Sequence, residues 1–181
     1  MKELSLHILD IAENSITAGA TRIEINVMEQ KEVDRLRIEV RDNGRGMDAG
    51  MAVAVTSPFV TTRTTRKVGL GIPLLKAAAE ACNGSFTLES TPSIGTALAV
   101  EFQLSHIDRM PLGDLPGTWL TLLVSHPDIN WVLEHRTDQG SFRLDSAELM
   151  TLLDGLSISD PAVLSFLRVY LEDGIKANTS N

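Results

Sequence analysis

Apolar residues recur along this chain with two different periods, and the period identifies the expected elements. In residues 3–18 and 72–82 they recur at steps of three and four, the spacing of an amphipathic helix. The second segment is followed by Asn83 and Gly84, residues that commonly end a helix. We therefore predict a helix near the N-terminus and another in the middle of the chain.

Four other segments alternate apolar and polar residues at every second position, as half-buried strands do. Residues 21–29 and 36–40 are joined by a polar turn and predict a hairpin, and residues 85–90 and 96–104 flank a second turn. The resulting order is helix, two strands, helices, two strands. It predicts an α+β fold, a two-layer sandwich in which helices cover one face of an antiparallel or mixed sheet.

The last third of the chain differs in composition. Residues 106–118 contain two prolines and two glycines and are predicted to be a linker after a first domain at 1–105. A small α+β appendage at 119–175 and a flexible tail at 176–181 follow. The appendage could add packing to the first domain, cover the open side of the sheet, form a dimer or dock a partner. Its expected elements are a strand at 119–124, a hairpin of 130–136 with 141–144, and two helices, from Asp145 to about Gly155 and from Asp160 to Gly174.

The composition excludes several classes of protein. A hydrophobic fraction of 43% can fill a core, and no apolar run approaches the roughly eighteen residues of a membrane span. The N-terminus lacks the basic region and apolar run of a signal peptide, so we expect a soluble, cytoplasmic protein. The single cysteine, Cys82, cannot form an internal disulfide, and the four histidines lack metal-ligand spacing, so no zinc site is predicted.

The charge distribution bears on the partners. The chain carries 16 Lys and Arg against 24 Asp and Glu, a net charge of −8. Residues 106–181 hold 5 basic and 11 acidic residues, whereas residues 1–105 hold 11 and 13. Affinity for nucleic acid depends on neutralising phosphates, so we do not expect nucleic acid to be the principal partner.

Three polar residues of the N-terminal helix are the first candidates for chemistry. His7, Asp10 and Asn14 are spaced by three and four residues and form one stripe beside the apolar face. An amide oxygen can complete the shell of a hard cation, and a carboxylate one turn away can orient a water. The alternative is a solvated helix face. For His7 we expect a supporting contact with Asp10, or contact with solvent.

The segment Asp42-Asn43-Gly44-Arg45-Gly46-Met47 is the second candidate. Asp-Asn-Gly is a hairpin turn signal, which is the simplest interpretation. However, a further glycine follows, and residues 48–56 are rich in alanine instead of forming the next alternating strand. An acidic acceptor flanked by glycines suits recognition of an exocyclic amine on a flat heterocycle.

A glycine hinge at residues 68–72, which opens a helix, is the third candidate. Gly69 and Gly71 let backbone amides approach a ligand, and a helix start adds unpaired N–H groups, a combination that suits phosphate. Such a pair also often only ends a loop. The preceding residues 59–67 hold hydroxyls and three cations, among them Arg66 and Lys67, and are predicted to be a mobile lid over a polyphosphate.

In this order, the segments resemble the ATP-binding fold shared by gyrase, the heat-shock chaperone family, histidine kinases and MutL, the Bergerat or GHKL fold. Residues 13–23 resemble the N box in the form found in MutL, and residues 42–47 resemble the first glycine box. Residues 58–62 with 69–72 resemble the F box, lid and second glycine box of histidine kinases, and Gly95-Thr96 takes the place of the last motif.

The resemblance spans roughly residues 3–105 and implies that the protein binds ATP with Mg²⁺. Asn14 would bind the Mg²⁺ that bridges the phosphates, and Asp42 would accept a hydrogen bond from the adenine amino group. The other implied contacts are Gly44, Gly46 and Met47 at the base, Thr96 beside Asp42 through a water, Gly69, Leu70 and Gly71 at the triphosphate, and Arg66 and Lys67 at the γ-phosphate when the lid closes.

Asp10 stands four residues before Asn14. At this place the ATPases and serine kinases of the fold carry a glutamate as general base, and histidine kinases commonly carry asparagine. Aspartate is one methylene shorter than glutamate. It could activate a water or a hydroxyl as the catalytic residue, or it could belong to the outer shell of the magnesium.

The resemblance implies three possible functions. The first is a stand-alone histidine-kinase-like protein that phosphorylates or regulates a partner protein. Because little chain precedes the N box, the phosphoacceptor is expected on another chain. The second is an ATP-operated switch like MutL, without phosphoryl transfer to protein. The third is a serine kinase of the anti-sigma type, which an acid at position 10 favours.

Overall fold

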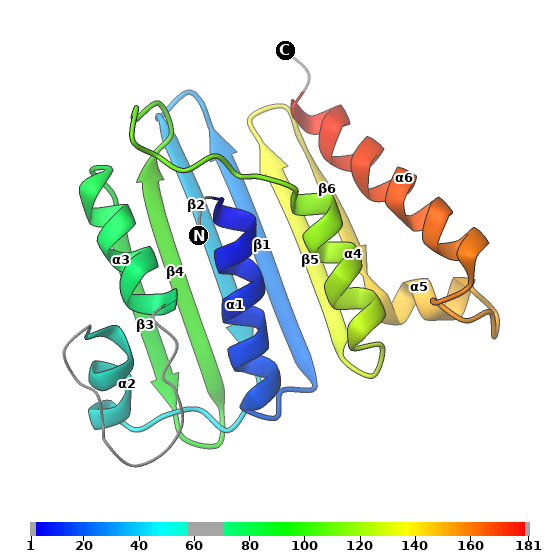
Figure 1. Ribbon diagram of the computed structural model, residues 1–181, viewed down its shortest axis with the longest axis horizontal. Coiled ribbons are helices and arrows are strands. Elements are labelled where there is room, and N and C mark those ends of the chain that lie inside the picture. Colours follow the sequence, from blue (N-terminus) through cyan, green and yellow to red (C-terminus); the bar gives the residue numbers. More distant parts are fainter. Residues whose placement is uncertain (1–2, 58–70, 180–181) are drawn as a thin grey trace.

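The computed structural model describes residues 3–57 and 71–179. They form a mixed sheet of six strands with helices layered against one face (Figure 1), which confirms the predicted α+β sandwich. The strands are β1 (Arg22–Gln30), β2 (Arg35–Asp42), β3 (Ser85–Thr91), β4 (Gly95–Gln103), β5 (Asn130–Thr137) and β6 (Gly140–Asp145); the helices are α1 (Leu4–Thr17), α2 (Ala49–Thr56), α3 (Gly71–Ala81), α4 (Leu115–Ser125), α5 (Ser146–Leu152) and α6 (Pro161–Thr179).

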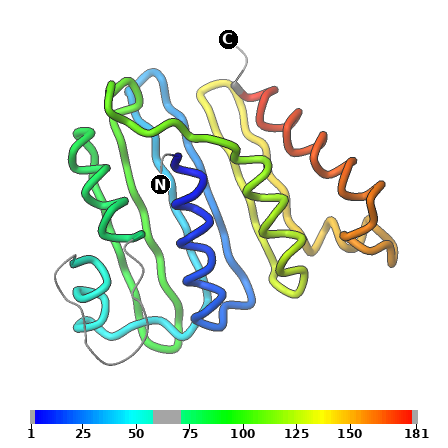
Figure 2. Tube along the Cα trace, in the orientation of Figure 1, coloured from blue at the N-terminus to red at the C-terminus, as the bar shows by residue number. Residues whose placement is uncertain are grey.

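The strands lie in the order β3-β4-β2-β1-β5-β6. Neighbouring strands are antiparallel except β1 and β5, which are parallel and therefore require a long crossover. After β4 the chain crosses the upper end of the sheet to reach α4 (Figure 2). Leu4 N and Ser5 N donate hydrogen bonds of 3.0 and 2.9 Å to the carbonyls of Pro111 and Leu112, which fix this crossing to the start of α1.

The face of the sheet toward the helices is apolar. Ile25, Ile38 and Val100, from three adjacent strands, are fully buried there, and α1 packs Leu4 and Ile8 against them. Burying a side chain of this size contributes about 1.5–3 kcal/mol, so the three- and four-residue spacing on α1 is what holds that helix to the sheet. The same continuous core includes the buried residues of the C-terminal segment, namely Trp119, Trp131, Leu133, Leu167 and Leu171.

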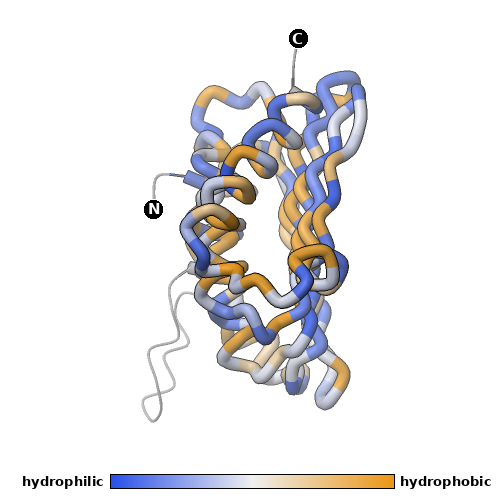
Figure 3. Tube along the Cα trace, turned by 90° about the vertical axis from the view of Figure 1, so that its right-hand side faces the viewer, coloured by the Kyte–Doolittle hydropathy of each residue, from blue (hydrophilic) through white to orange (hydrophobic). Residues whose placement is uncertain are grey.

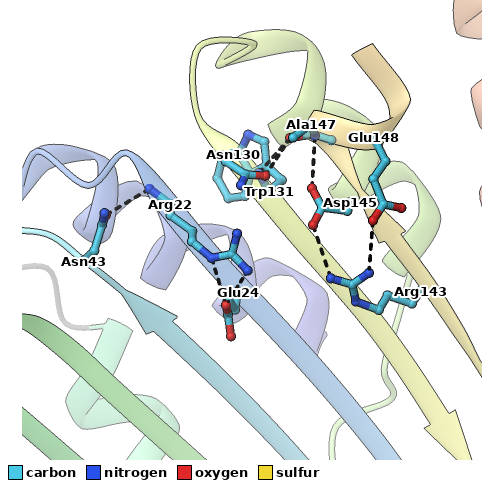
Figure 4. Close-up of polar contacts among 10 residues, drawn as sticks. Arg22, Glu24, Asn43, Asn130, Trp131, Arg143, Asp145, Ala147 and Glu148 are labelled. Carbon is cyan, nitrogen blue, oxygen red and sulfur yellow. Dashed lines mark hydrogen bonds and ion pairs between the residues drawn. The ribbon is translucent and has the colours of Figure 1, made fainter. Parts of the chain in front are cut away.

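The opposite face of the sheet is polar. Its arginines and carboxylates pair along and across strands, as in the Arg37–Glu101 pair at 2.8 Å and the Arg22–Glu24 pair at 2.8 Å (Figure 4). Seen from the side, the helices lie in a layer against one face (Figure 3). The suggestion that the appendage covers the open face is therefore wrong, because α6 packs on β5, β6 and α4 in the helical layer.

Residues 119–124 form part of helix α4, and our prediction of a strand there is wrong. A short apolar run is compatible with a buried helix and with a buried strand. An N-capping residue before the run indicates a helix. Asp114 provides that signal: its Oδ1 accepts a hydrogen bond of 2.9 Å from Gly117 N, with Pro116 in the first turn. The helix then buries residues spaced as on one helical face, Leu115, Trp119, Leu122 and Leu123.

Gly174 does not end the last helix, as the sequence predicts, because α6 continues to Thr179. The glycine has a packing role instead. A Cβ at this position would lie 2.2 Å from Cδ2 of Phe142, whose ring also packs edge-on against Tyr170. Helix α6 can therefore approach β6 closely only because residue 174 has no side chain.

Replacing Gly174 with alanine should destabilise the protein. In an ordinary helix this change stabilises by about 0.5–1 kcal/mol, whereas overpacking a core costs about 1–3 kcal/mol, so the sign of the effect is the test. The measurement is the free energy of unfolding in urea. In a Phe142→Leu background the same change should cost less, and a stabilising effect in the native sequence would contradict the packing.

Candidate functional site

A cavity of about 360 Å³ opens between α1, α2, the start of α3 and the ends of β2 and β4. Concave, mainly apolar sites with a few polar groups commonly bind small molecules. Five residues expected at the site line it. The lining residues are Ile11, Asn14, Ser15, Thr17, Ala18, Val40, Asp42, Arg45, Gly46, Met47, Met51, Val55, Ile72, Leu88, Thr96 and Leu98.

Asp42, the last residue of β2, presents its carboxylate to this cavity. Ser15 Oγ donates a hydrogen bond of 2.6 Å to Oδ2, and Gly44 N donates one of 2.9 Å to Oδ1. An ionised carboxylate has about four lone-pair sites, so each oxygen keeps acceptor capacity for a ligand. The two hydrogen bonds thus orient the carboxylate and leave acceptor sites free for a ligand.

The loop after Asp42 is tied to the end of α1 and the start of β1. Asn43 Oδ1 accepts a hydrogen bond of 2.9 Å from Arg22 N (Figure 4) and another of 2.9 Å from Thr21 N, and Asn43 Nδ2 donates to Thr21 Oγ1 at 2.9 Å. Arg45 N donates to Ala18 O at 3.0 Å. Asp-Asn-Gly is therefore not a hairpin turn, because its side chains and backbone bond to a different part of the chain.

Two glycines allow the other side of this loop to pack closely against the turn between β3 and β4. Gly46 has φ +64°, and a Cβ there would lie 2.0 Å from Thr91 O. Gly95 has φ +138°, and a Cβ there would lie 1.9 Å from the carbonyl oxygen of Asp42. Both positions exclude a side chain by contact as well as by backbone conformation.

Thr96 lies directly opposite Asp42 on the adjacent strand β4, and Ser90 on β3 lies opposite Thr96. The Ser90 and Thr96 hydroxyl oxygens are 2.8 Å apart. Ser90 Oγ also accepts a hydrogen bond of 2.8 Å from Met47 N and donates one of 3.1 Å to Gly95 O. Ser90 therefore connects Thr96 to the loop that carries Asp42.

The polar stripe of α1 meets the start of α3. Asn14 is exposed at the mouth of the cavity. Asp10 does not line the cavity; its carboxylate packs against Gly71, where a Cβ would lie 1.7 Å from Oδ2. Gly71 is thus required for the contact between Asp10 and the first residue of α3.

His7 is buried next to the same glycine, contrary to the alternative that it faces solvent. It is 4% exposed, and its Nδ1 has no hydrogen-bond partner. Burial lowers the pKa of His7, although the nearby Asp10 and a hydrogen bond to the Gly71 backbone act in the opposite direction. The ring is therefore kept neutral between the two helices.

Several expected site residues lie outside the described residues. These are the lid at 59–67 with Arg66 and Lys67, and Gly69 and Leu70 of the hinge. Gly71 is described and begins α3, and Gly44 supports Asp42 through its N–H without lining the cavity. Their proposed contacts with phosphate remain predictions.

The sequence analysis missed two hydroxyls that organise the site. Ser15 occupies a position on the apolar face of α1, and a buried polar residue in such a place requires a partner, which here is Asp42. Ser90 is the last residue but one of β3, and no neighbouring residue in the sequence indicates a role for it. The apolar walls from α2, Met51 and Val55, were also missed, because α2 buries none of its residues and looks unremarkable in sequence.

Three further observations concern the described part of the chain. No helix within it is long and apolar enough to cross a membrane. Within the same residues, no three His, Cys, Asp or Glu side chains gather into a group that could hold a metal ion. Cys82 is buried, and burial raises the pKa of its thiol, which disfavours the reactive thiolate.

Comparison with known proteins gives the family to which this fold belongs. The sequence model of the histidine kinase-, DNA gyrase B- and HSP90-like ATPase family matches residues 2–106, more than half of the chain. The chain belongs to this family, and it contains a GHKL ATPase domain of the histidine kinase or MutL type.

The individual relatives include sensor proteins and a mismatch repair protein. Sensor protein kinase FleS of Pseudomonas aeruginosa is 39% identical over 89 residues, which cover 49% of this chain and 22% of FleS. A putative sensor protein of Shewanella frigidimarina is 28% identical over 59% of this chain and 17% of its own length. Mismatch repair endonuclease pms1 of Dictyostelium discoideum is 41% identical over 34% of this chain and 6% of its own. The chain spans less than a quarter of each relative.

Two solved structures share the fold. The MutL ATPase domain of Aquifex aeolicus complexed with ADP matches with a TM-score of 0.52 and 12% identity, covering 94% of this chain and 70% of that one. The N-terminal domain of a DNA repair protein matches with a TM-score of 0.50 and 14% identity, covering 97% and 57%. Both matches extend well beyond residue 106, where the family match ends.

The buried His7 predicts a specific pH dependence of stability. Because its pKa is lowered in the folded state, the unfolded chain, with a histidine pKa of about 6.5, binds the proton first as the pH falls. The stability that depends on neutral His7 is complete above that pH and is lost as the pH falls below it. His7→Gln should therefore flatten the decline in unfolding free energy between about pH 7 and about pH 5.

The measurement is urea denaturation of both proteins across this range. His106→Gln, at a half-buried position, is the control and should keep the native slope. An unchanged slope in His7→Gln would show that the ring does not carry this dependence.

Proposed function

We propose that this chain binds ATP with Mg²⁺ in the cavity beside Asp42 and uses it to phosphorylate or regulate a partner protein. The observation that carries the proposal is the Asp42 carboxylate, which Ser15 and Gly44 hold at the wall of a largely apolar cavity with acceptor sites to spare. Membership of the ATPase family and the fold shared with an ADP-bound MutL domain support it. We place this activity in the cytoplasm, because ATP is available there.

The adenine base occupies the apolar part of the cavity in this proposal. Its amino group donates a hydrogen bond to Asp42, and Thr96 stands beside that contact on the next strand. Gly46 and Met47 line the adjacent wall, where the missing side chain of Gly46 keeps the loop close to the hairpin. Selection for adenine then follows from the position of one fixed acceptor.

The phosphates lie toward α3, with Mg²⁺ beside Asn14. Asn14 is exposed at the mouth of the cavity, and its amide oxygen suits a hard cation whose other ligands are phosphate oxygens and waters. Helix α3 begins at Gly71, and its first N–H groups and positive dipole end favour phosphate. The remaining contacts with phosphate are assigned from the sequence motifs alone. They are Gly69, Leu70, Arg66 and Lys67.

Asp10 is the proposed catalytic carboxylate. It packs on Gly71, so it stands at the start of α3, on the side proposed for the phosphates. There it can orient a water or a partner hydroxyl toward the γ-phosphate, or it can hydrogen-bond to a water bound to magnesium. In either role it would act by positioning and by stabilising charge, which dominate phosphoryl transfer.

A MutL-like switch is the second candidate function. In it, nucleotide binding changes dimerisation or partner binding, and no phosphoryl group passes to protein. The observations that favour it are the N box at residues 13–23, the similarity to pms1 over 61 residues, and the structural match to MutL over 94% of the chain.

Incubation with γ-labelled ATP and a candidate partner separates these functions. Acid-labile label on the partner supports a histidine kinase, and acid-stable label supports a serine kinase of the anti-sigma type. Free phosphate without labelled protein supports the switch. Proteins that associate only in the presence of a non-hydrolysable ATP analogue provide the candidate partners.

Replacing Asp42 with asparagine should weaken ATP and ADP binding about tenfold to a hundredfold, because a hydrogen bond to a charged group contributes about 1.5–3 kcal/mol. The measurement is calorimetric titration with Mg²⁺ present. Glu80→Gln, which removes an exposed acid from α3, is the matched control and should bind normally. A folded Asp42→Asn protein with native affinity would refute the proposed mode of purine selection.

Replacing Asp10 with asparagine should lower turnover of saturating Mg-ATP by about 10²–10⁴ if the carboxylate is a general base, while nucleotide affinity changes little. Release of γ-phosphate or labelling of the partner gives the rate. Glu13→Gln is the control, because Glu13 lies on the same helix, is exposed and pairs with His126 at 3.5 Å instead of facing Gly71. Native turnover in Asp10→Asn would remove the catalytic role.

A further inference from the structure

We infer that Ser90 determines nucleotide specificity by fixing the direction of the Thr96 hydroxyl, so that the cavity favours a purine with an amino group at position 6 over one with a carbonyl. This inference rests on the proposed function of the cavity. Ser90 does not line the cavity and acts only through its neighbours. It is therefore a positioning residue.

The three polar side chains form a row across three adjacent strands. Ser90 on β3 is the direct partner of Thr96 on β4, and Thr96 is the direct partner of Asp42 on β2. Side chains directly opposite one another point to the same face of a sheet, here the face of the helices and the cavity. Thr96 and Asp42 line the cavity, and Ser90 stands behind Thr96.

The contacts of Ser90 favour one arrangement of hydroxyl protons. Met47 N can only donate, so its bond of 2.8 Å occupies a lone pair of Ser90 Oγ. Either hydroxyl can donate across the 2.8 Å contact between Ser90 Oγ and Thr96 Oγ1, whereas Gly95 O, 3.1 Å from Ser90 Oγ, can only accept. When the single Ser90 proton goes to Gly95 O, the Thr96 hydroxyl donates its own proton to Ser90, and all three contacts of Ser90 are satisfied at once.

This arrangement decides what Thr96 offers to a ligand. With its proton committed to Ser90, the Thr96 oxygen faces the cavity as an acceptor, beside the acceptor oxygens of Asp42. Two neighbouring acceptors favour an amino group, directly or through a water, and repel a carbonyl oxygen. Without Ser90, the Thr96 hydroxyl could rotate and donate to a carbonyl, and the discrimination would weaken.

The test compares the dissociation constants of Mg-ATP and Mg-ITP, which differ at position 6 of the purine. The dissociation constant of Mg-ITP divided by that of Mg-ATP should fall about threefold to tenfold in Ser90→Ala, the effect of one neutral hydrogen bond. Ser90→Thr retains the hydroxyl and should restore the native ratio. In a Thr96→Val background, Ser90→Ala should leave the ratio unchanged, because the group it orients is already gone.

A purely structural role for Ser90 predicts a different result. Ser90→Ala would then weaken both nucleotides equally, or lower the ratio just as much in the Thr96→Val background, and either outcome overturns the inference. If Ser90→Ala does not fold, Thr96→Val decides: it should lower the ratio while Thr96→Ser does not. Failure of the native protein to bind Mg-ATP would instead refute the proposed function.

Discussion

The site depends on a steric constraint, the close approach of the backbone at residues 42–47 to its neighbours. A Cβ on Gly46 would meet Thr91 O at 2.0 Å, and one on Gly95 would meet the Asp42 carbonyl at 1.9 Å. These two glycines bring the loop onto the β3–β4 turn, while Asn43 holds its other side to the start of β1. The direction of the Asp42 carboxylate is thus set by the fold before any ligand arrives, which is the condition for selective binding at low entropic cost.

The C-terminal segment, residues 106–179, shares the sheet and the hydrophobic core of the N-terminal part. Strand β5 pairs with β1 along its length, and α4 packs beside α1. At the end of α4, His126 lies 3.5 Å from Glu13, the residue before Asn14. Helix α1, which supplies Asn14 and Ser15 to the site, is therefore held between α3 and α4.

The sequence predicted the six strands and most of the helices, because burial on one face imposes a period of two or of 3.6 residues. It did not predict that β5 and β6 join the same sheet, because the parallel pairing of β5 with β1 brings together residues far apart in the sequence. The prediction was wrong at residues 119–124, where the apolar run lacks a clear period and the capping residue Asp114 determines that a helix forms. It was also wrong at Gly174, because the packing of this glycine against Phe142 depends on a distant strand. Asp42 was predicted because glycines flank it. Ser15 and Ser90 were not, since nothing near a serine in the sequence reveals a hydrogen-bond partner on another element.

Amide chemical shifts of the labelled protein, followed while Mg-ADP is added, test the central claim most directly. The account predicts saturable shifts concentrated at Asn14 and Ser15, in the loop from Asp42 to Met47, and at Gly95 and Thr96, with little change on β6. These residues come from separate parts of the sequence and come together at the cavity and in the loops that form its wall. No saturable shifts at millimolar nucleotide, or shifts confined to the C-terminal segment, would contradict it.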